Sequence, residues 1–220
     1  MADTVLVTGT DIGVGKTWVA CGLAHAIRHA GRSVTAVKAV ETGCEDRPAP
    51  TEDGARLAAA TGQTTPTRAL RRFRASIAPA PAADLEGLTL DLDELAAEIG
   101  AAAGTSQLLL LEGAGGLLSP LGWDWNAVDL AQAVHATALV VASDRLGTIN
   151  HTLLTLSALD LAGVRVAAIV LSAPAAADAS TGSNGPAIAR LSGIDRVRSV
   201  PRLAEPEAAV PWLGEVAAWL

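Results

Sequence analysis

Two lysines stand in stretches whose residue types could handle phosphate. Lys16 lies in TGTDIGVGKT, residues 8–17. This stretch is close to the phosphate-loop pattern G-x-x-x-x-G-K-[ST], in which backbone N–H groups cradle phosphates, the lysine reaches the outer phosphates and the hydroxyl binds Mg²⁺. The spacing differs by one residue, because Gly9 lies one place earlier than the pattern requires. We predict that this loop forms a phosphate site from Gly13, Val14, Gly15, Lys16 and Thr17, with Thr17 also as a metal ligand.

The second lysine, Lys38, belongs to the stretch VKAVETG. Lys16 and Lys38 are the two lysines among the 16 basic residues, and the others are arginines. Because the chain uses arginine at every other basic position, its lysines indicate sites that need a compact, mobile ammonium. We predict that Lys38 ends a strand and points into the phosphate cleft, where it would be unpaired unless an anion occupied the site. Such a lysine suits the charge on a transferring phosphoryl group; a surface lysine is the alternative. Thr42 follows in a turn, where its hydroxyl could hold a polar substrate group.

Two acidic residues could complete the site. Glu112 follows four leucines, and a carboxylate at the end of a buried strand needs a cation such as Mg²⁺ or several hydrogen-bond donors. The glycines after Glu112 would keep the backbone open around phosphates, with a simple tight turn as the alternative. Asp53 heads a predicted helix, where a helix cap is the simpler local interpretation and a metal ligand the alternative.

Alternating strands and helices must position these residues. Short apolar runs predict strands at 4–8, 33–39, 107–113, 136–143 and 164–172, with a weaker one at 196–200. Amphipathic stretches predict helices at 16–30, 52–61, 92–103, 126–135, 148–162, 184–192 and 206–219. The alternation predicts one α/β domain over residues 1–220, with a mostly parallel sheet covered by helices on both faces. Parallel sheets bind ligands beyond the carboxyl ends of their strands, so the candidate residues should gather there.

The connections between these elements differ in character. Residues 44–51 and 172–186 are predicted loops, the second partly disordered. Residues 63–90 form a long, proline-interrupted connection, and loops of that length are often functional. The basic cluster at 68–74, RALRRFR, is interpreted as a solvated helix or loop face.

The composition limits the function classes. A chain of 220 residues that is 50% hydrophobic can bury one substantial core. A net charge of -7 argues against a nucleic-acid partner, which would need clustered positive charge. The chain shows no signal peptide and no apolar run of about 18 residues, so we expect a cytoplasmic protein without a membrane partner. Cys21 and Cys44 are expected to be free thiols.

Five stretches together resemble those of the dethiobiotin synthetase family, whose members close a cyclic urea on 7,8-diaminononanoate with CO₂ and ATP. The stretches are VTGTDIGVGKT, VKAVETG, EDGARL, EGAGGLLSPL and RLGTINHTLLTLSAL. In this family the phosphate loop carries five residues between its glycine and Gly-Lys-Thr, so the extra residue is a family trait. Weaker similarity in SIAPAPAADLEG and VPRLAEPE extends the resemblance over nearly the whole chain.

The resemblance implies a P-loop NTPase-like three-layer fold and a role for each candidate residue. Lys38 and Lys16 would be catalytic, and Thr17, Asp53 and Glu112 would hold Mg²⁺, so Asp53 would be more than a cap. Thr42 would contact the diaminononanoate, and Gly147, Thr148, Ile149 and Asn150 would receive the substrate carboxylate across a homodimer interface, at a helix start. The implied nucleotide-binding set is Gly13, Val14, Gly15, Lys16, Thr17, Trp18, Asp53, Glu112, Gly113, Ala114, Gly115, Ser172, Ala173, Pro201, Arg202 and Leu203.

Three positions depart from the family pattern. Ile12 replaces a small or hydroxyl residue, Ala39 replaces a proline whose loss would loosen the Lys38 turn, and Ser172 replaces an asparagine that reads the adenine edge. Because serine offers a single hydroxyl, we expect ATP to work but GTP or CTP to substitute better than in relatives with the asparagine. Two other functions are alternatives: a P-loop nucleotide switch of the partitioning type and a catalytically silent homodimeric scaffold.

Overall fold

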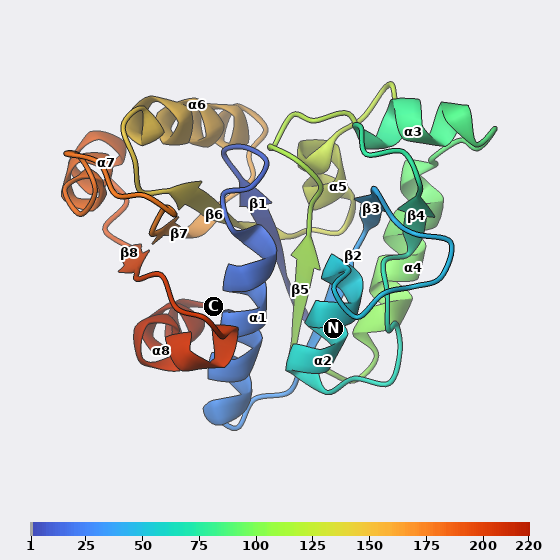
Figure 1. Cartoon of the computed structure of the whole chain (residues 1–220), viewed down its shortest axis with the longest axis horizontal. Helices are drawn as coiled ribbons and strands as arrows, with labels where there is room; N and C mark the ends of the chain where they lie inside the picture. The colour runs from blue at the N-terminus through green and yellow to red at the C-terminus, as the bar shows by residue number, and fades with distance from the viewer. Residues whose placement is uncertain (1) are drawn as a thin grey trace.

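The computed structural model describes residues 2–220 and contains two sheets whose strand pairs are all parallel (Figure 1). The main sheet has the strand order β2-β5-β1-β6-β7-β8. Its strands are β1 (Asp3–Gly9), β2 (Val34–Lys38), β5 (Leu108–Glu112), β6 (Thr137–Ser143), β7 (Val166–Ser172) and β8 (Val197–Val200). The six predicted strands are confirmed, with small shifts at their ends.

Helices cover both faces of the main sheet. One layer contains α1 (Lys16–His29), α2 (Asp53–Thr61) and α8 (Val210–Trp219), which follows the short 3-10 helix η1 (Pro206–Ala209). The other layer contains α4 (Leu92–Ala103), α5 (Ala127–Ala133), α6 (Thr148–Leu161) and α7 (Asn184–Ser192). The predicted three-layer α/β fold is therefore confirmed.

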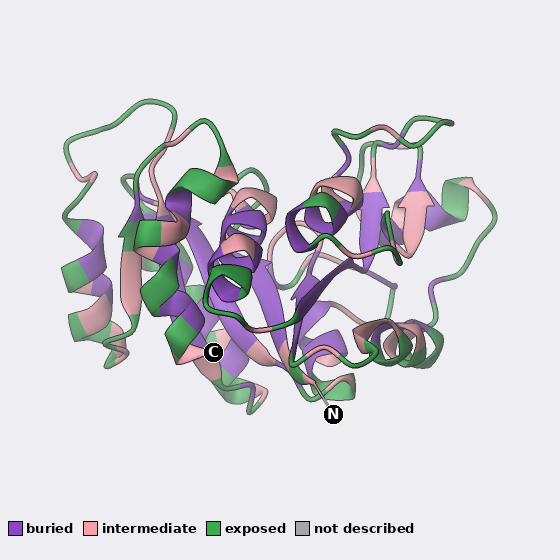
Figure 2. Cartoon of the chain, turned by 90° about the horizontal axis from the view of Figure 1, so that it is seen from below, coloured by how far each residue is buried: buried purple, intermediate pink, exposed green. Residues whose placement is uncertain are grey.

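The four leucines of β5 show how the sequence fills both layers. Leu108 and Leu110 pack with the cluster under α1, whereas Leu109 and Leu111 pack with the cluster under α4. Successive side chains of a strand point to opposite faces, so a strand covered on both sides is apolar at every position. Figure 2 shows the strands of the main sheet buried between the helices. Glu112 ends this run at the carboxyl edge.

The connection at 63–90 contains structure that the sequence patterns did not predict. Its strand β4 (Arg71–Phe73) pairs with β3 (Val40–Thr42) in a second, two-stranded sheet, and α3 (Pro79–Leu85) follows. A strand of three residues is too short to show a periodic pattern. The pair is anchored by Phe73, which is fully buried.

The basic cluster lies partly in that small sheet. Arg71 pairs with Glu98 at 2.8 Å on α4, and Arg72 pairs with Glu52 just before α2. The interpretation of residues 68–74 as a solvated helix or loop face was therefore wrong for these two arginines. Neighbouring acidic side chains hold them because a half-buried guanidinium needs anionic partners.

The loop between β7 and α7 is fixed to the start of α6. Asp178 Oδ2 accepts a hydrogen bond from the Leu146 backbone N–H at 2.8 Å, and Asp144 Oδ1 accepts one from the Asn184 side chain at 2.7 Å. The structure describes all of residues 172–186, so the expectation of partial disorder is corrected. These hydrogen bonds hold the loop in place, although its composition of small residues does not predict an ordered segment.

Two further expectations concern thiols and membranes. Cys21 and Cys44 are both buried and free, which confirms the prediction for the thiols. Within residues 2–220, no helix combines the length and the apolar character that a bilayer crossing requires.

Candidate active site

The phosphate loop joins β1 to α1 at the carboxyl edge of the sheet. Gly15 caps α1 with a φ of +96°, a left-handed conformation that favours glycine. A Cβ added at Gly15 would lie 3.1 Å from Ser172 Oγ, so a larger residue would also press on β7. The first N–H groups of a helix lack intrahelical partners, and together with the helix dipole they favour a bound anion. The local geometry is that of a phosphate cradle.

Lys16 lies over this cradle and is buried. Its Nζ donates a hydrogen bond to the Asp11 carbonyl oxygen at 3.0 Å across the loop. Burial, with a smaller effect of the Lys38 charge, lowers the pKa of Lys16 to about 8, although nearby carboxylates act in the opposite direction. Lys16 is thus charged at neutral pH but poised to lose its proton just above it.

Lys38 lies at the end of β2 beside Glu112 at the end of β5, because the two residues are register partners. Its Nζ lies 2.6 Å from Glu112 Oε1, 2.9 Å from Asp53 Oδ2 and 3.1 Å from the Gly113 carbonyl oxygen. The expectation that Lys38 would be unpaired without a bound anion was therefore wrong. The two carboxylates meet at the same edge, and buried carboxylates need a cation close by.

The charges of this group stabilise one another. Burial by itself would lower the pKa of Lys38, but Glu112 and Asp53 outweigh it and raise that pKa above its ordinary value. Burial would also raise the pKa of Asp53, yet the Lys38 ammonium holds it below the ordinary value. Lys38 and Asp53 therefore both stay charged at neutral pH.

The three residues predicted as metal ligands lie together. The Thr17 hydroxyl donates to Glu112 Oε1 at 2.7 Å, and Asp53 shares the Lys38 ammonium with the same carboxylate. Glu112 Oε2 is buried and has no hydrogen-bond partner within the described residues. A hydroxyl and two carboxylates are the hard oxygen ligands that Mg²⁺ prefers, so the donor set fits that ion.

Glu41, to which the sequence analysis assigned no role, positions Asp53. Its two carboxylate oxygens accept hydrogen bonds from the backbone N–H groups of Asp53 at 2.5 Å and Gly54 at 3.1 Å, so Glu41 caps α2. A Cβ at Gly54 would lie 2.2 Å from the Ala69 backbone nitrogen, so this close approach requires glycine. The local preference for Asp53 as the cap was wrong, and its carboxylate is left to face Lys38.

Ala39, where the family pattern has a proline, is hydrogen-bonded to the neighbouring strand. Its backbone N–H donates to the Glu112 carbonyl oxygen at 3.3 Å, and its side chain is buried. A proline at this position could not make that hydrogen bond. Ala39 is therefore tied to β5 by a hydrogen bond that a proline would lack, and the effect of the substitution on the flexibility of the turn stays a prediction.

A cavity of about 580 Å³ surrounds the two lysines. Its walls include the predicted residues Lys16, Thr17, Lys38, Thr42, Asp53, Glu112, Ala114 and Gly115. The sequence analysis missed Arg56 on α2, Ser119 and the segment 76–79 at the start of α3, which also line it. Pro79 at the first position of α3 is a helix-start signal that could have located this wall.

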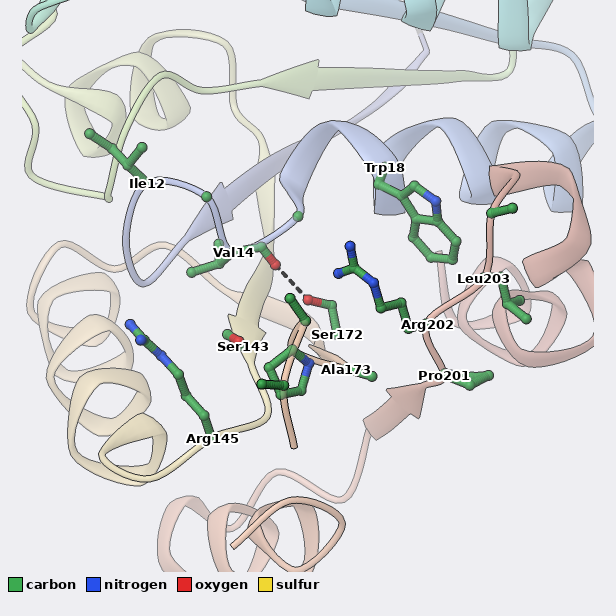
Figure 3. A pocket seen from close by; sticks show the side chains of 16 residues that line it. Ile12, Val14, Trp18, Ser143, Arg145, Ser172, Ala173, Pro201, Arg202 and Leu203 are labelled. Atoms are coloured by element: carbon green, nitrogen blue, oxygen red, sulfur yellow. Dashed lines mark hydrogen bonds between the residues drawn. The ribbon is translucent and has the colours of Figure 1, made fainter. Parts of the chain in front are cut away.

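A second cavity of about 790 Å³ lies on the other side of the phosphate loop, between α1 and the strands β7 and β8 (Figure 3). It contains the remaining predicted nucleotide residues Val14, Ser172, Ala173, Pro201, Arg202 and Leu203. Both cavities are lined by Ile12, Gly13, Gly15 and Trp18, so they adjoin across the loop. Gly113 lines neither cavity, but its carbonyl oxygen accepts from Lys38.

The residues Gly147–Asn150 form the start of α6 and line neither cavity of their own chain. Gly147 caps this helix at a φ of +92°. Farther along, α6 borders a shallow cavity of about 410 Å³ with Leu117 and Leu118. The structure thus does not bring this predicted substrate group together with Lys38 within one chain.

Comparison with known proteins gives a consistent result. Residues 3–216 match the family model described as AAA domain. The ATP-dependent dethiobiotin synthetase BioD of Anaeromyxobacter dehalogenans is 40% identical over 216 residues, which cover 97% of this chain and 92% of that protein. The protein of the same name from a Caulobacter species is 44% identical over 172 residues, covering 76% and 75%.

Solved structures share the fold at much lower sequence identity. The septum site-determining protein MinD of Pyrococcus horikoshii, complexed with Mg-ADP, superposes with a TM-score of 0.60 at 17% identity, over 98% of this chain and 96% of that one. A likeness at this identity shows the common P-loop NTPase-like fold and nothing about the reaction.

Proposed function

Because the chain belongs to the ATP-dependent dethiobiotin synthetase family, we propose that it converts 7,8-diaminononanoate, CO₂ and ATP into dethiobiotin, ADP and phosphate. Such an enzyme is a ligase that forms carbon–nitrogen bonds. The observation that best supports the proposal is the placement of Lys38 and Lys16 in one cavity beside a phosphate cradle. This arrangement suits the transfer of a phosphoryl group to an anionic acceptor.

The proposed reaction has three steps. One amine of the substrate attacks CO₂ and loses a proton, which gives a carbamate. A carbamate oxygen then attacks the γ-phosphorus of ATP, and ADP leaves. The second amine finally attacks the carbamate carbon, the bond to the phosphate oxygen breaks, and the ring closes as a cyclic urea. The protein supplies position and charge in each step and no covalent nucleophile.

The two lysines would contact different charged groups during the reaction. Lys16 and the loop N–H groups would hold the outer phosphates of ATP. Lys38, which stays charged because Glu112 and Asp53 raise its pKa, would lie between the carbamate and the γ-phosphate. Charge develops on both groups as the phosphoryl group moves, so a fixed ammonium there would lower the barrier.

Thr17, Asp53 and Glu112 would hold Mg²⁺, which would neutralise charge on the phosphate oxygens of ATP. The buried Glu112 Oε2, which has no hydrogen-bond partner among residues 2–220, supports this assignment. Thr42 lines the same cavity as Lys38 and would contact the diamine.

A homodimer would complete the substrate site. The side chains of Leu146, Leu154 and Leu161 are exposed by 81%, 62% and 90%, and all three lie on or just before α6. Exposed large apolar side chains that gather on one helix are typical of an interface, and a second copy of the chain would cover them. The start of α6 in that copy, at Gly147–Asn150, would then reach the carboxylate of the diaminononanoate. We place the protein in the cytoplasm, where buried free thiols are usual.

Measuring ATP turnover with and without the diamine and bicarbonate tests the proposal. A synthetase needs both compounds for steady turnover. A nucleotide switch would hydrolyse ATP to the same extent without either compound, and a silent scaffold would show no turnover in any mixture. Both of these results would contradict the proposed reaction.

A further inference from the structure

The hydroxyl of Ser172 is hydrogen-bonded to the phosphate loop. Its hydroxyl donates to the Val14 carbonyl oxygen at 2.6 Å, and its oxygen lies against the position of Gly15 (Figure 3). A hydroxyl has one hydrogen to donate, and here that hydrogen is used. Ser172 therefore anchors the loop to β7 and has no hydrogen left for a nucleotide base.

Arg202 is the charged side chain that enters the same cavity from the segment after β8. Figure 3 shows its guanidinium directed toward the phosphate loop, between Ser172 and Trp18. Within residues 2–220, Arg202 forms no ion pair, in contrast to Arg71 and Arg72. Its N–H donors are thus available to a molecule in the cavity.

The remaining side chains of this cavity define what it can recognise. Trp18 offers an apolar ring surface, and the second charged group is Arg145 on the far side. Among the described residues that line the cavity there is no carboxylate and no carboxamide. A guanidinium donates five hydrogen bonds and accepts none, and it also stacks well on planar rings. The charged recognition groups of the cavity are therefore donors.

We propose that Arg202, with Trp18, is the specificity-determining pair for the nucleotide base, and that the cavity accepts bases with carbonyl oxygens at their edge as well as adenine. Guanine presents O6 and N7 as acceptors, which a guanidinium can contact in a bidentate manner. Cytosine presents its O2 carbonyl. This inference rests on the proposed function, because it assigns the second cavity to the base of the phosphoryl donor.

The test compares kcat/KM for ATP, GTP and CTP in the parent and in Arg202→Gln. The parent should use GTP and CTP within about tenfold of ATP. Loss of a charged donor should lower the values for GTP and CTP by about tenfold, while the value for ATP changes by less than about threefold. The control Arg190→Gln removes the same charge from α7, outside both cavities, and should leave the ratios unchanged. A parent that is strict for ATP, or equal losses for all nucleotides in Arg202→Gln, would overturn the proposal.

Two further measurements separate this inference from the proposed function. Ser172→Ala should lower kcat/KM for ATP, GTP and CTP by the same factor. A loss confined to ATP would show that Ser172 reads the base. Calorimetry with non-hydrolysable ATP and GTP analogues needs no diamine. If Arg202→Gln shifts the analogue affinities as predicted but no dethiobiotin forms, the base assignment stands and the proposed function fails. If dethiobiotin forms and Arg202→Gln leaves the ratio of affinities unchanged, the base assignment fails alone.

Discussion

The ammonium of Lys38 and the carboxylate of Glu112 meet at 2.6 Å, both buried, at the ends of two neighbouring strands. This contact links the proposed phosphoryl-transfer lysine to a proposed metal ligand. The raised pKa of Lys38 means that its stabilising charge is present throughout the neutral range and is lost only as pH rises through that raised value. We therefore expect that titration of Lys38 causes no change in catalytic rate between pH 6 and 9.

Replacing this lysine should separate catalysis from nucleotide binding. In Lys38→Arg the positive charge remains, but the planar guanidinium cannot occupy the compact position of an ammonium between two carboxylates. We expect kcat to fall on the order of 10² to 10³-fold, the usual effect of removing one transition-state contact, with ATP affinity nearly unchanged. Steady-state kinetics and calorimetry measure the two quantities on the same preparation. A near-native rate would remove Lys38 from the mechanism.

The metal assignment predicts a loss of Mg²⁺ affinity in two separate variants. Asp53→Asn and Glu112→Gln each remove an anionic oxygen from the proposed site, and each should weaken Mg²⁺ binding in the presence of ATP on the order of 10-fold or more. Calorimetric magnesium titrations provide the measurement. Glu98→Gln breaks an ion pair with Arg71, and Glu98 does not line the cavity of the proposed metal site, so this variant serves as the control. Titrations of both site variants that overlay the control would refute the assignment.

Lys16 should give nucleotide binding its pH dependence. Its lowered pKa, about 8, means that the free protein loses this charge as pH rises through 8, whereas a bound phosphate favours the protonated form. ATP affinity should therefore fall above pH 8, by at most about tenfold per pH unit, with proton uptake on binding. Calorimetry in buffers of different ionisation enthalpy detects that uptake. Lys16→Met should bind ATP more weakly and without this dependence; an identical pH profile in both proteins would exclude Lys16 as its source.

The fold was largely predictable because its signals are local. Most strands of the main sheet contain an apolar run such as the leucines before Glu112, and a run of that kind predicts its own element. The exception is β8, whose sequence VRSV gives a weaker signal. By contrast, β3 and β4 have three residues each and pair although they lie far apart in the chain, with Phe73 buried in the core. No short-range pattern encodes such a contact.

The candidate site was predictable in its membership but not in its contacts. The loop glycines, both lysines and both carboxylates carry motif signals and lie together as expected. Glu41 was missed because a cap supplied from another element leaves no pattern around Asp53. The hydrogen bond from Ser172 to Val14 joins residues 158 positions apart, and no sequence pattern reveals that this hydroxyl anchors the loop and does not read the base.

Mixing two inactive variants tests the shared substrate site. Lys38→Ala removes the lysine from its own chain, and Asn150→Ala, at the exposed start of α6, should disturb the site of the other chain. In a twofold dimer, random exchange gives half mixed dimers, each with one intact site, so about a quarter of the parent activity should return. Light scattering checks that each variant still dimerises. Activity that stays at the level of the single variants would place both groups in one chain, or the protein outside a shared-site dimer.

The most direct test of the central claim is a product balance with isotopically labelled bicarbonate, 7,8-diaminononanoate and Mg-ATP. The proposed reaction predicts labelled dethiobiotin with one labelled carbon per molecule, formed in a ratio of about one to one with both ADP and phosphate, and formed only when all three substrates are present. ADP and phosphate released without labelled dethiobiotin would contradict the claim.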